Sequence, residues 1–359
     1  AKMGEVLTNS QIGGRRNMVI NGAMQVAQRG TSFTDVSTSA YQLDRFKTGM
    51  GDTTARFTVT QATAGLNGFA NSFKYDCTTA EASLANASAR LFFHTRFEGQ
   101  DLQQLKKGTS DAEKVTVSFY VKSNKTGTYT LELQDQDNSR SNSQTYTISS
   151  SNTWERKIIT FDADTTGAFD DDNALSLIIY WHLIAGTTYT SGTFNTSWAT
   201  NTNANRVSSS NVNIGDSTDN TWEITGIQME VGSQATPFEH RSFGEELALC
   251  QRYFLLYADS NELIGGGGYQ SSTFPDVVVV LPLTMRTDPS LVQTSGSDYY
   301  GIVTHNAVAV NFTDFTVAYT SSPRHQLLYP DENVSGTQGS YARFQTNSAG
   351  GRISYNAEL

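Results

Sequence analysis

The chain has 359 residues, a formal net charge of −10, 29 glycines and six prolines, and 17% of its residues are charged. The acidic balance argues against nucleic-acid binding, which requires clusters of Lys and Arg, and no run of about 18 apolar residues predicts a transmembrane helix. The low charge and the many glycine, threonine, serine and asparagine residues are typical of a turn-rich all-β protein, and the length favours two domains.

Residues 1–16 show no hydrophobic period, and the opening AKMGEVLTNS has no apolar core, so it does not predict a signal peptide. Gly13, Arg15 and Arg16 belong to a flexible basic stretch. This stretch is either a disordered terminus or a peptide that docks onto a neighbouring protein. The residues alone leave both interpretations open, and the docking segment would comprise residues 1–30. Asn17–Ala27 is a strand candidate with a turn at Asn21–Gly22.

Residues 31–241 are predicted to form one β-sandwich. The clearest strand is Lys114–Val121, and after a polar turn at Ser123–Gly127 the alternation resumes in Tyr129–Leu133, which predicts a hairpin. The continuous apolar run Leu175–Trp181 predicts a strand buried on both faces. Further strands are expected at Arg56–Thr60, Ser72–Cys77, Arg90–Phe97, Tyr146–Ile148, Trp154–Phe161 and Trp222–Val231, with one short helix near Asp101–Lys106. Many strands joined by short turns are typical of a sandwich or jelly roll.

A single helix is predicted at residues 242–256, where it connects two β-rich domains. Ser242 and Glu245 have the spacing of a capping box at its start. The apolar face of this helix is expected to carry Phe243, Leu247, Cys250 and Phe254.

Residues 257–359 are predicted to form a second, smaller β domain. Gly265–Gly268 is interpreted as a hinge, and Val277–Val280 is an aggregation hazard if it is exposed, which burial in an oligomer interface would resolve. Short strands are expected at Asp276–Leu281, Gly301–Thr304, Ala307–Phe312, Phe315–Thr320, Tyr341–Gln345 and Arg352–Tyr355. The predicted fold is all-β: a jelly-roll β-sandwich, one connecting helix and a smaller C-terminal β-sandwich domain.

The junction between the two domains carries a longer pattern. Residues 225–254 read TGIQMEVGSQATPFEHRSFGEELALCQRYF, and this stretch resembles a junction in tail-fibre-like and other virion structural proteins of tailed bacteriophages. There the pattern runs ITG-(V/I)-Q-(L/M)-E-x-G, then ATPFEHR and a helix that ends in CQRYF. Asn17–Gly30, Tyr41–Phe46 and Val115–Ser123 resemble further segments of the same proteins. The resemblance covers about residues 15–256 and extends only loosely over residues 257–359.

The resemblance implies a phage particle component with a carbohydrate-binding-module-like jelly roll, and it implies no defined ligand. It also implies synthesis in the host cytoplasm without a leader, and a place in the virion reached when residues 1–30 dock onto other virion proteins. Fibres of this type are usually homotrimers. Phe243, Leu247 and Phe254 are therefore expected in a helix bundle near the threefold axis or on the adjoining sandwich.

Aromatic residues in polar loops are the candidates for glycan binding, because sugars stack on exposed rings while polar side chains fix their hydroxyl groups. In the first domain, Tyr189 and Trp198 lie in a long polar loop. The favoured alternative is that this loop folds over the sandwich edge and buries its rings. In the second domain the candidates are Tyr299, Tyr300 and Tyr319.

The densest carboxylate cluster is the loop 162–173, DADTTGAFDDDN. Carboxylate oxygens suit calcium, and jelly-roll sugar-binding modules often carry a structural calcium ion, which is an analogy of fold. A solvated acidic turn is the favoured alternative, and no cofactor is expected to be required. The candidate calcium ligands are Asp162, Asp164, Asp170, Asp171 and Asp172.

Catalytic chemistry finds little support in the sequence. Cys77 and Cys250 are expected to be buried thiols, and the five histidines show no spacing typical of a metal site or a catalytic triad. No motif selects the two carboxylates that glycoside hydrolysis requires. The predicted function is therefore that of a virion adhesin that binds host surface glycans without catalysis and does not insert into membranes. The alternatives are a capsid decoration or head-fibre protein with a purely structural role, and a polysaccharide depolymerase.

Overall fold

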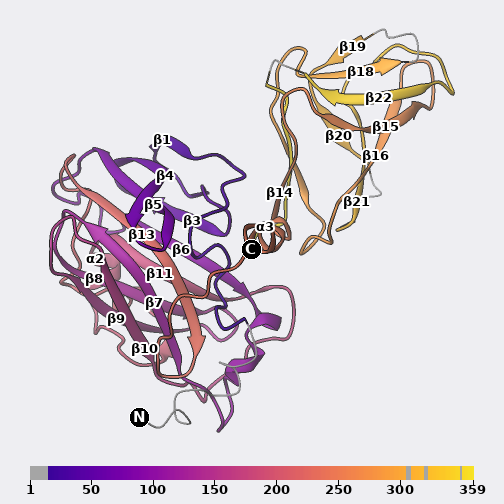
Figure 1. The fold of residues 1–359 in the computed structure, drawn as a ribbon. Coiled ribbons are helices and arrows are strands. Elements are labelled where there is room, and N and C mark those ends of the chain that lie inside the picture. The colour runs from indigo at the N-terminus through magenta and orange to yellow at the C-terminus, as the bar shows by residue number, and fades with distance from the viewer. Residues whose placement is uncertain (1–14, 305–308, 319–321, 348–349) are drawn as a thin grey trace. The chain divides into compact units, whose positions relative to one another are not determined.

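The computed structural model describes residues 15–304, 309–318, 322–347 and 350–359. The chain divides into two compact units, residues 1–246 with Leu359 and residues 247–358 (Figure 1). The boundary falls inside the helix Phe243–Gln251 (α3). None of the described helices is long and apolar enough to cross a membrane.

The first unit is a sandwich of two antiparallel sheets. One sheet has six strands, in the spatial order Ser32–Val36 (β1), Arg56–Leu66 (β4), Phe69–Thr79 (β5), Thr221–Val231 (β13), Val115–Ser123 (β7) and Glu155–Phe161 (β10). The other has seven, in the order Ala199–Thr200 (β12), Arg140–Ile148 (β9), Gly127–Asp135 (β8), Leu175–Ala185 (β11), Arg90–Glu98 (β6), Phe46–Gly51 (β3) and Ala40–Tyr41 (β2). The chain crosses repeatedly from one sheet to the other between β3 and β13, in the manner of a jelly roll, so the predicted sandwich is confirmed.

Alternation along the strands places one face of each sheet in a shared aromatic core. Trp181 of β11 and Trp222 of β13 are completely buried there. The ring of Phe93 lies between them, with centroids 5.4 Å from Trp181 and 5.9 Å from Trp222. Strand β11 lies between β8 and β6, and its residues are buried on both faces, as the continuous apolar run predicted.

The predicted hairpin between β7 and β8 is wrong. Strand β7 pairs with β13 and β10 in one sheet, whereas β8 pairs with β9 and β11 in the other. The turn between them therefore crosses the sandwich. Alternation identifies the buried face of a strand but not its hydrogen-bonding partner, and both arrangements bury the same side chains.

Residues 15–31, the described part of the chain before β1, contain no strand, contrary to the one expected at Asn17–Ala27. Their backbone is hydrogen-bonded to residues more than 200 positions later. Glu239 Oε2 accepts hydrogen bonds from the backbone N–H groups of Arg16 (2.6 Å) and Asn17 (2.7 Å). The Asn17 side chain donates to the carbonyl oxygen of Ile227 at 3.1 Å. Of the predicted docking residues, Gly13 lies outside the described residues, Arg15 is exposed, and Arg16 is held in this contact.

Arg241 and Glu246 complete this arrangement, which we call the N-terminal clasp (Asn17, Glu239, Arg241 and Glu246). The Arg241 guanidinium donates to the carbonyl oxygens of Asn17 and, at 3.1 Å, Val19. It also pairs with Glu246 at 3.2 Å. Residues 17–19 are thus in direct contact with the stretch 239–246 inside the first unit.

Helix α3 is shorter than predicted. Its capping box is confirmed, because the Ser242 backbone N–H donates to Glu245 Oε2 at 3.1 Å and Ser242 Oγ accepts from the Glu245 N–H at 3.3 Å. Phe243 is exposed and Leu247 is half-buried. The placement of Phe254 on the helix face is wrong. The helix ends at Gln251, and Phe254 is buried as the first residue of a strand.

The second unit contains two further antiparallel sheets. A three-stranded sheet has the order Phe254–Ala258 (β14), Ile353–Asn356 (β23) and Ser290–Gln293 (β17). A seven-stranded sheet has the order Ala309–Phe312 (β19), Tyr300–Thr304 (β18), Tyr341–Thr346 (β22), Leu263–Tyr269 (β15), Pro275–Val280 (β16), His325–Pro330 (β21) and Phe315–Val317 (β20). The predicted second β domain is therefore confirmed.

The glycines interpreted as a hinge lie instead in β15, inside the seven-stranded sheet. A side chain at Gly267 would place its Cβ 1.8 Å from the carbonyl oxygen of Asp276, so close strand contact explains the need for glycine there. In the neighbouring β16, Val277 and Val279 are buried, whereas Val278 and Val280 are 55% and 67% exposed. The outer face of this sheet is therefore partly apolar.

Candidate functional site

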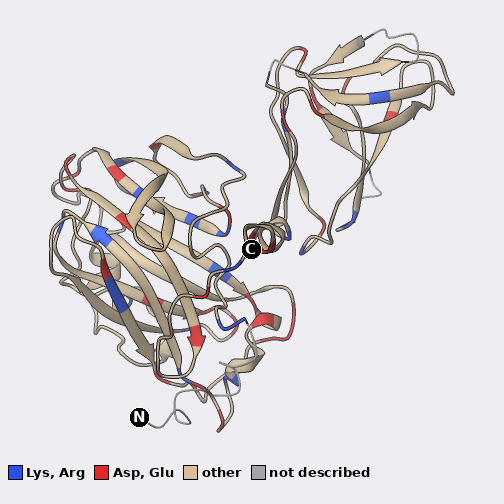
Figure 2. Ribbon diagram, viewed as in Figure 1, with Lys and Arg blue, Asp and Glu red and all other residues tan. Residues whose placement is uncertain are grey.

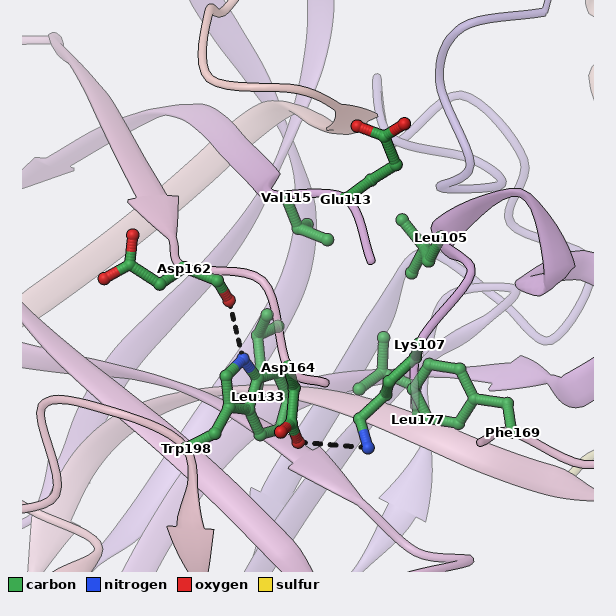
Figure 3. Close-up of a pocket in the computed structure, with 10 residues that line it drawn as sticks. All are labelled: Leu105, Lys107, Glu113, Val115, Leu133, Asp162, Asp164, Phe169, Leu177 and Trp198. Carbon is green, nitrogen blue, oxygen red and sulfur yellow. Dashed lines mark hydrogen bonds and ion pairs between the residues drawn. The ribbon is translucent and has the colours of Figure 1, made fainter. Parts of the chain in front are cut away.

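The acidic loop meets the sandwich edge at a small pocket beside Trp198 (Figure 3). The cavity has a volume of about 20 Å³, which is room for little more than one water molecule. Trp198 is half-buried against the core, and its Nε1 donates to the carbonyl oxygen of Asp162 at 2.8 Å. The polar loop that contains Trp198 therefore folds over the sandwich edge at this residue. This is the alternative to an exposed glycan-binding loop that the sequence analysis favoured.

Two buried carboxylates lie beside this pocket, and both are paired. Lys107 Nζ lies 2.5 Å from Asp135 Oδ2 and 3.1 Å from Asp164 Oδ2. Arg140 makes a two-point contact with Asp164, at 2.8 Å and 3.0 Å. Burial alone would raise the pKa of Asp164, but Arg140 and Lys107 hold that pKa below its ordinary value.

The other predicted calcium ligands do not converge on Asp164. Asp162 is exposed and pairs with Lys114 at 2.7 Å, and Asp170, Asp171 and Asp172 are exposed. Within the described part of the chain, no group of three or more His, Cys, Asp or Glu residues is arranged to hold a metal ion. The structure therefore does not bring the five aspartates together, and calcium binding stays a prediction without geometric support.

A larger pocket lies on the outer face of the seven-stranded sheet of the first unit. The cavity has a volume of about 130 Å³. It lies between strands β6 and β11 and the loop that follows β11, which contains the short helix Thr187–Thr190 (α2). The residues that form its walls include Arg90, Phe92, Tyr180, His182, Tyr189 and Arg206.

Strand alternation explains the aromatic wall of this pocket. Phe93 and Trp181 face the core, so their neighbours Phe92, Tyr180 and His182 face outward. The rings of Phe92 and Tyr180 are 4.9 Å apart and perpendicular, and Tyr180 stacks on His182 at 5.8 Å. These contacts fix the orientation of rings that a ligand in the cavity would meet.

A buried ion pair between Arg206 and Glu132 attaches the loop that follows β11 to strand β8. Arg206 Nε and Nη2 donate to the Glu132 carboxylate at 2.9 Å and 3.0 Å, and His182 Nε2 donates to Glu132 Oε2 at 2.8 Å. Burial alone would raise the pKa of Glu132, but Arg206 and His182 lower it. Burial lowers the pKa of His182 despite Glu132. Glu132 is therefore charged and His182 neutral at neutral pH.

A second buried histidine lies beside the pocket. His94 stacks on Tyr180 with ring centroids 5.2 Å apart. Burial is the main cause that holds the pKa of His94 well below its ordinary value, and the positive charges of Arg96 and Lys47 act in the same direction. His94 therefore remains neutral in the folded protein.

The rim of the pocket is polar. Tyr189 belongs to α2 and is half-buried, and its hydroxyl accepts from Arg90 at 3.4 Å. Arg90 also pairs with Asp52 at 2.5 Å. Among the residues predicted from the sequence, only Tyr189 lines this pocket. Tyr180 lies inside the apolar run Leu175–Trp181 and His182 directly follows it, and these two polar-tipped residues at alternate positions could have indicated an outward face.

The aromatic candidates of the second unit differ in exposure. Tyr300 is completely buried, and its hydroxyl donates to the carbonyl oxygens of Thr294 and Arg352. The expectation that Tyr300 is exposed is therefore wrong. Tyr299 is half-buried, and Tyr319 lies outside the described residues. Tyr341 is 57% exposed on the outer face of β22. The sequence predicted a strand there but did not identify Tyr341 as a candidate for glycan binding.

Charged residues of both signs are interspersed along the strands and loops of each unit (Figure 2). The acidic surplus does not gather on one sheet, and most basic side chains near the larger pocket have an acidic partner.

No protein-family model and no curated protein matches the sequence. Among solved structures, tailspike protein 4 of bacteriophage CBA120 is similar over 60% of this chain and 21% of its own, with 14% identity and a TM-score of 0.29. The CBM22-1–GH10 modules of Clostridium thermocellum xylanase 10B are similar over 58% and 30%, with 13% identity and a TM-score of 0.30. TmCBM61 bound to β-1,4-galactotriose is similar over 60% and 99%, with 10% identity and a TM-score of 0.31. These TM-scores are too low to support any inference about ligand or function.

Proposed function

We propose that this protein is a virion structural protein of a tailed phage, a tail-fibre-like adhesin that binds host surface glycans without catalysis. The observation that carries glycan binding is the pocket on the outer face of the seven-stranded sheet. It combines fixed aromatic rings, Phe92, Tyr180 and Tyr189, with the polar groups of Arg90, which is the composition that orients a sugar ring.

The size of the pocket supports a short ligand. Its volume of about 130 Å³ is well below the roughly 300–1,000 Å³ of sites for larger molecules. One sugar residue, such as the end of a glycan chain, is the proposed occupant. A weak single site of this kind would act through several copies, since linked sites can raise avidity by roughly 10²–10⁴.

A non-catalytic role is supported by the state of Glu132, the buried carboxylate bonded to Arg206 and His182, which line the pocket. Glycoside hydrolysis needs a carboxylic acid whose pKa is raised so that it can donate a proton. The pKa of Glu132 is lowered by Arg206 and His182, which is the opposite direction. Glu132 is therefore proposed to hold the loop in place rather than to react.

A glycan microarray of purified protein, followed by calorimetric titration of the best-binding oligosaccharide, tests this function. Tyr189→Ala should weaken binding about tenfold, which corresponds to about 1.4 kcal/mol for loss of a stacking ring. Tyr341→Ala, a change to an exposed ring of the second unit, is the matched control. Glycan binding that depends on Tyr341 and not on Tyr189 would place the site elsewhere, and binding to no glycan would reject the adhesin.

The virion assignment is supported by the phage-like pattern of residues 225–254 and by its contact with Asn17 through the clasp. Assembly as a homotrimer with docking to other virion proteins is part of the proposal. The exposed Val278 and Val280 favour a covered face, which also suits the alternative role of a capsid decoration or head-fibre protein. Light scattering of the purified chain tests the proposed homotrimer, because a monomer at micromolar concentration would reject it.

A further inference from the structure

The larger pocket of the first unit presents hydrogen-bond donors and no acid. Arg90 and Arg206 line the cavity, whereas none of its described lining residues is an aspartate or a glutamate. The hydroxyl of Tyr189 accepts a hydrogen bond from Arg90 at 3.4 Å, so its own proton remains available to a ligand. Guanidinium groups donate hydrogen bonds and never accept them. The charged groups of the pocket therefore suit a ligand group that only accepts hydrogen bonds.

One edge of the Arg90 guanidinium is unused. Its Nη1 donates to Asp52 Oδ2 at 2.5 Å and to the carbonyl oxygen of Ser88 at 3.3 Å, besides Tyr189. Within the described part of the chain, Nε and Nη2 of Arg90 donate to no protein atom. The guanidinium lies over Gly51 of β3, where a Cβ would come within 2.8 Å of Nη2 and 3.0 Å of Cζ. Glycine at this position therefore leaves the room that Arg90 occupies, and Nε and Nη2 remain for a ligand.

The same edge of an arginine already binds a carboxylate twice in this unit. Arg206 holds Glu132 through Nε at 2.9 Å and Nη2 at 3.0 Å. Arg140 holds Asp164 through Nε at 2.8 Å and Nη2 at 3.0 Å. The N–H groups of this edge are parallel, so together they match the two oxygen atoms of a carboxylate. Arg90 offers the same pair of donors without a carboxylate of the chain to receive them.

We propose that the pocket binds an acidic sugar, and that Nε and Nη2 of Arg90 hold its carboxylate in a two-point contact. This inference rests on the proposed glycan-binding function and specifies the class of glycan, a chain that ends in a uronic acid or another sugar with a carboxylate. The cavity of about 130 Å³ admits one such residue, with its ring against Phe92 and Tyr189. A neutral sugar of the same shape would leave the free edge of Arg90 without a charged partner.

The charges around the pocket are compatible with an anion, although the whole chain has a net charge of −10. The two arginines of the pocket are each offset by one acid, so these pairs are neutral as a whole. Two further positive charges, Arg96 and Lys47, act on His94, which stacks on Tyr180 of the pocket wall. Asp52, the acid paired with Arg90, is 41% exposed, so water screens its repulsion of a carboxylate.

Calorimetric titration with matched monosaccharide glycosides tests the proposal. Glucuronic, galacturonic and N-acetylneuraminic acid are each compared with their methyl ester, and the two uronic acids also with glucose and galactose. In the preferred series the acid should bind at least about tenfold more tightly than its ester and its neutral counterpart, because its two hydrogen bonds are charge-assisted. The 6-sulfates of glucose and galactose complete the panel, since a site that prefers them takes a different anion and overturns the assignment of a carboxylate.

Variants locate the contact. Arg90→Gln removes the charge and the two-point edge, and it should reduce the preference for the acid to less than about threefold. Arg343→Gln, the same change at an exposed position of β22 in the second unit, is the matched control and should keep the wild-type preference. Gly51→Ala places a methyl group against Arg90 Nη2 and should also reduce the preference for the acid. If Arg90→Gln does not fold, Gly51→Ala decides.

The outcomes separate this inference from the proposed function. A neutral sugar that binds as tightly as its acid, and that depends on Tyr189, would overturn the acidic ligand and leave glycan binding intact. A preference for the acid that persists in both Arg90→Gln and Gly51→Ala would overturn the role of Arg90. Binding of no sugar by the wild-type protein, on the array or in solution, would reject the acidic ligand together with the adhesin.

Discussion

Replacing His94 by Phe should make the first unit less sensitive to mild acid. The folded state holds the pKa of His94 well below the ordinary value of about 6.5, whereas the unfolded chain does not. Below that pH, His94 is protonated in the unfolded state but stays neutral in the folded state. The free energy of unfolding therefore falls as pH falls. Phe suits the same place, since His94 already packs against the rings of Phe92 and Tyr180, with centroids 5.3 Å and 5.2 Å away.

The magnitude follows from proton linkage. One histidine that stays neutral in the folded state loses about 1.4 kcal/mol of stability between pH 7.5 and pH 5.5. His182 contributes a loss of the same sign, because its pKa is also lowered. Glu132 acts in a lower window, since its lowered pKa gives stability that is lost only as pH falls below about 4.5. His94→Phe should therefore remove about 1.4 kcal/mol of the wild-type loss and leave the contribution of His182.

Urea denaturation followed by tryptophan fluorescence measures this difference. All four tryptophans lie in the first unit, so the signal reports on that unit. His240→Asn, at an exposed position, is the control and should keep the wild-type difference between pH 7.5 and pH 5.5. The reasoning is refuted if His94→Phe loses as much stability over this interval as the wild type does.

Three other perturbations give separate tests. Arg241→Ala leaves the buried Glu246 carboxylate without its ion-pair partner, with only its hydrogen bond from the Asn21 N–H, and should cost the first unit about 3–5 kcal/mol in urea denaturation; a cost below 1 kcal/mol would mean that the clasp is dispensable. Gly22→Ala places a Cβ 2.1 Å from the carbonyl oxygen of Ile227 and should cost about 1–3 kcal/mol in the same assay, and unchanged stability would contradict this close approach. EDTA should leave the Tm of the natural chain unchanged within about 1 °C, whereas a clear drop would reveal a tightly bound calcium ion.

Periodicity in the sequence located most strands of both units. Val115, Val117, Phe119 and Val121 alternate and are all buried, as predicted. The same signal could not show that β7 and β8 belong to different sheets, because sheet partners are chosen by the packing of the whole chain. It also misread Gly265–Gly268, since a glycine run serves a hinge and a closely paired strand equally well.

The sites were harder to predict than the strands. The larger pocket joins Phe92, Tyr180 and Tyr189, and its ion pair joins Glu132 with Arg206, so its parts are distant in sequence and meet only on the folded sheet. Lys107 reaches Asp135 and Asp164 for the same reason. The packing of Trp198 against the sandwich was expected, because the same kind of loop recurs in the proteins that the sequence resembles.

The N-terminal clasp brings residues 16–21 of the first unit next to its residues 239–246. Arg16 and Asn17 are hydrogen-bonded to Glu239, and Asn21 is hydrogen-bonded to Glu246, so the first described residues of the unit and its last residues lie side by side. Adjacent ends are the condition under which circular permutation and insertion into another protein succeed. A permuted first unit, with its ends joined by a short glycine linker and opened at the exposed Ser150–Ser151 turn, should therefore keep its fold. The same geometry would let this unit be exchanged as a module between longer chains.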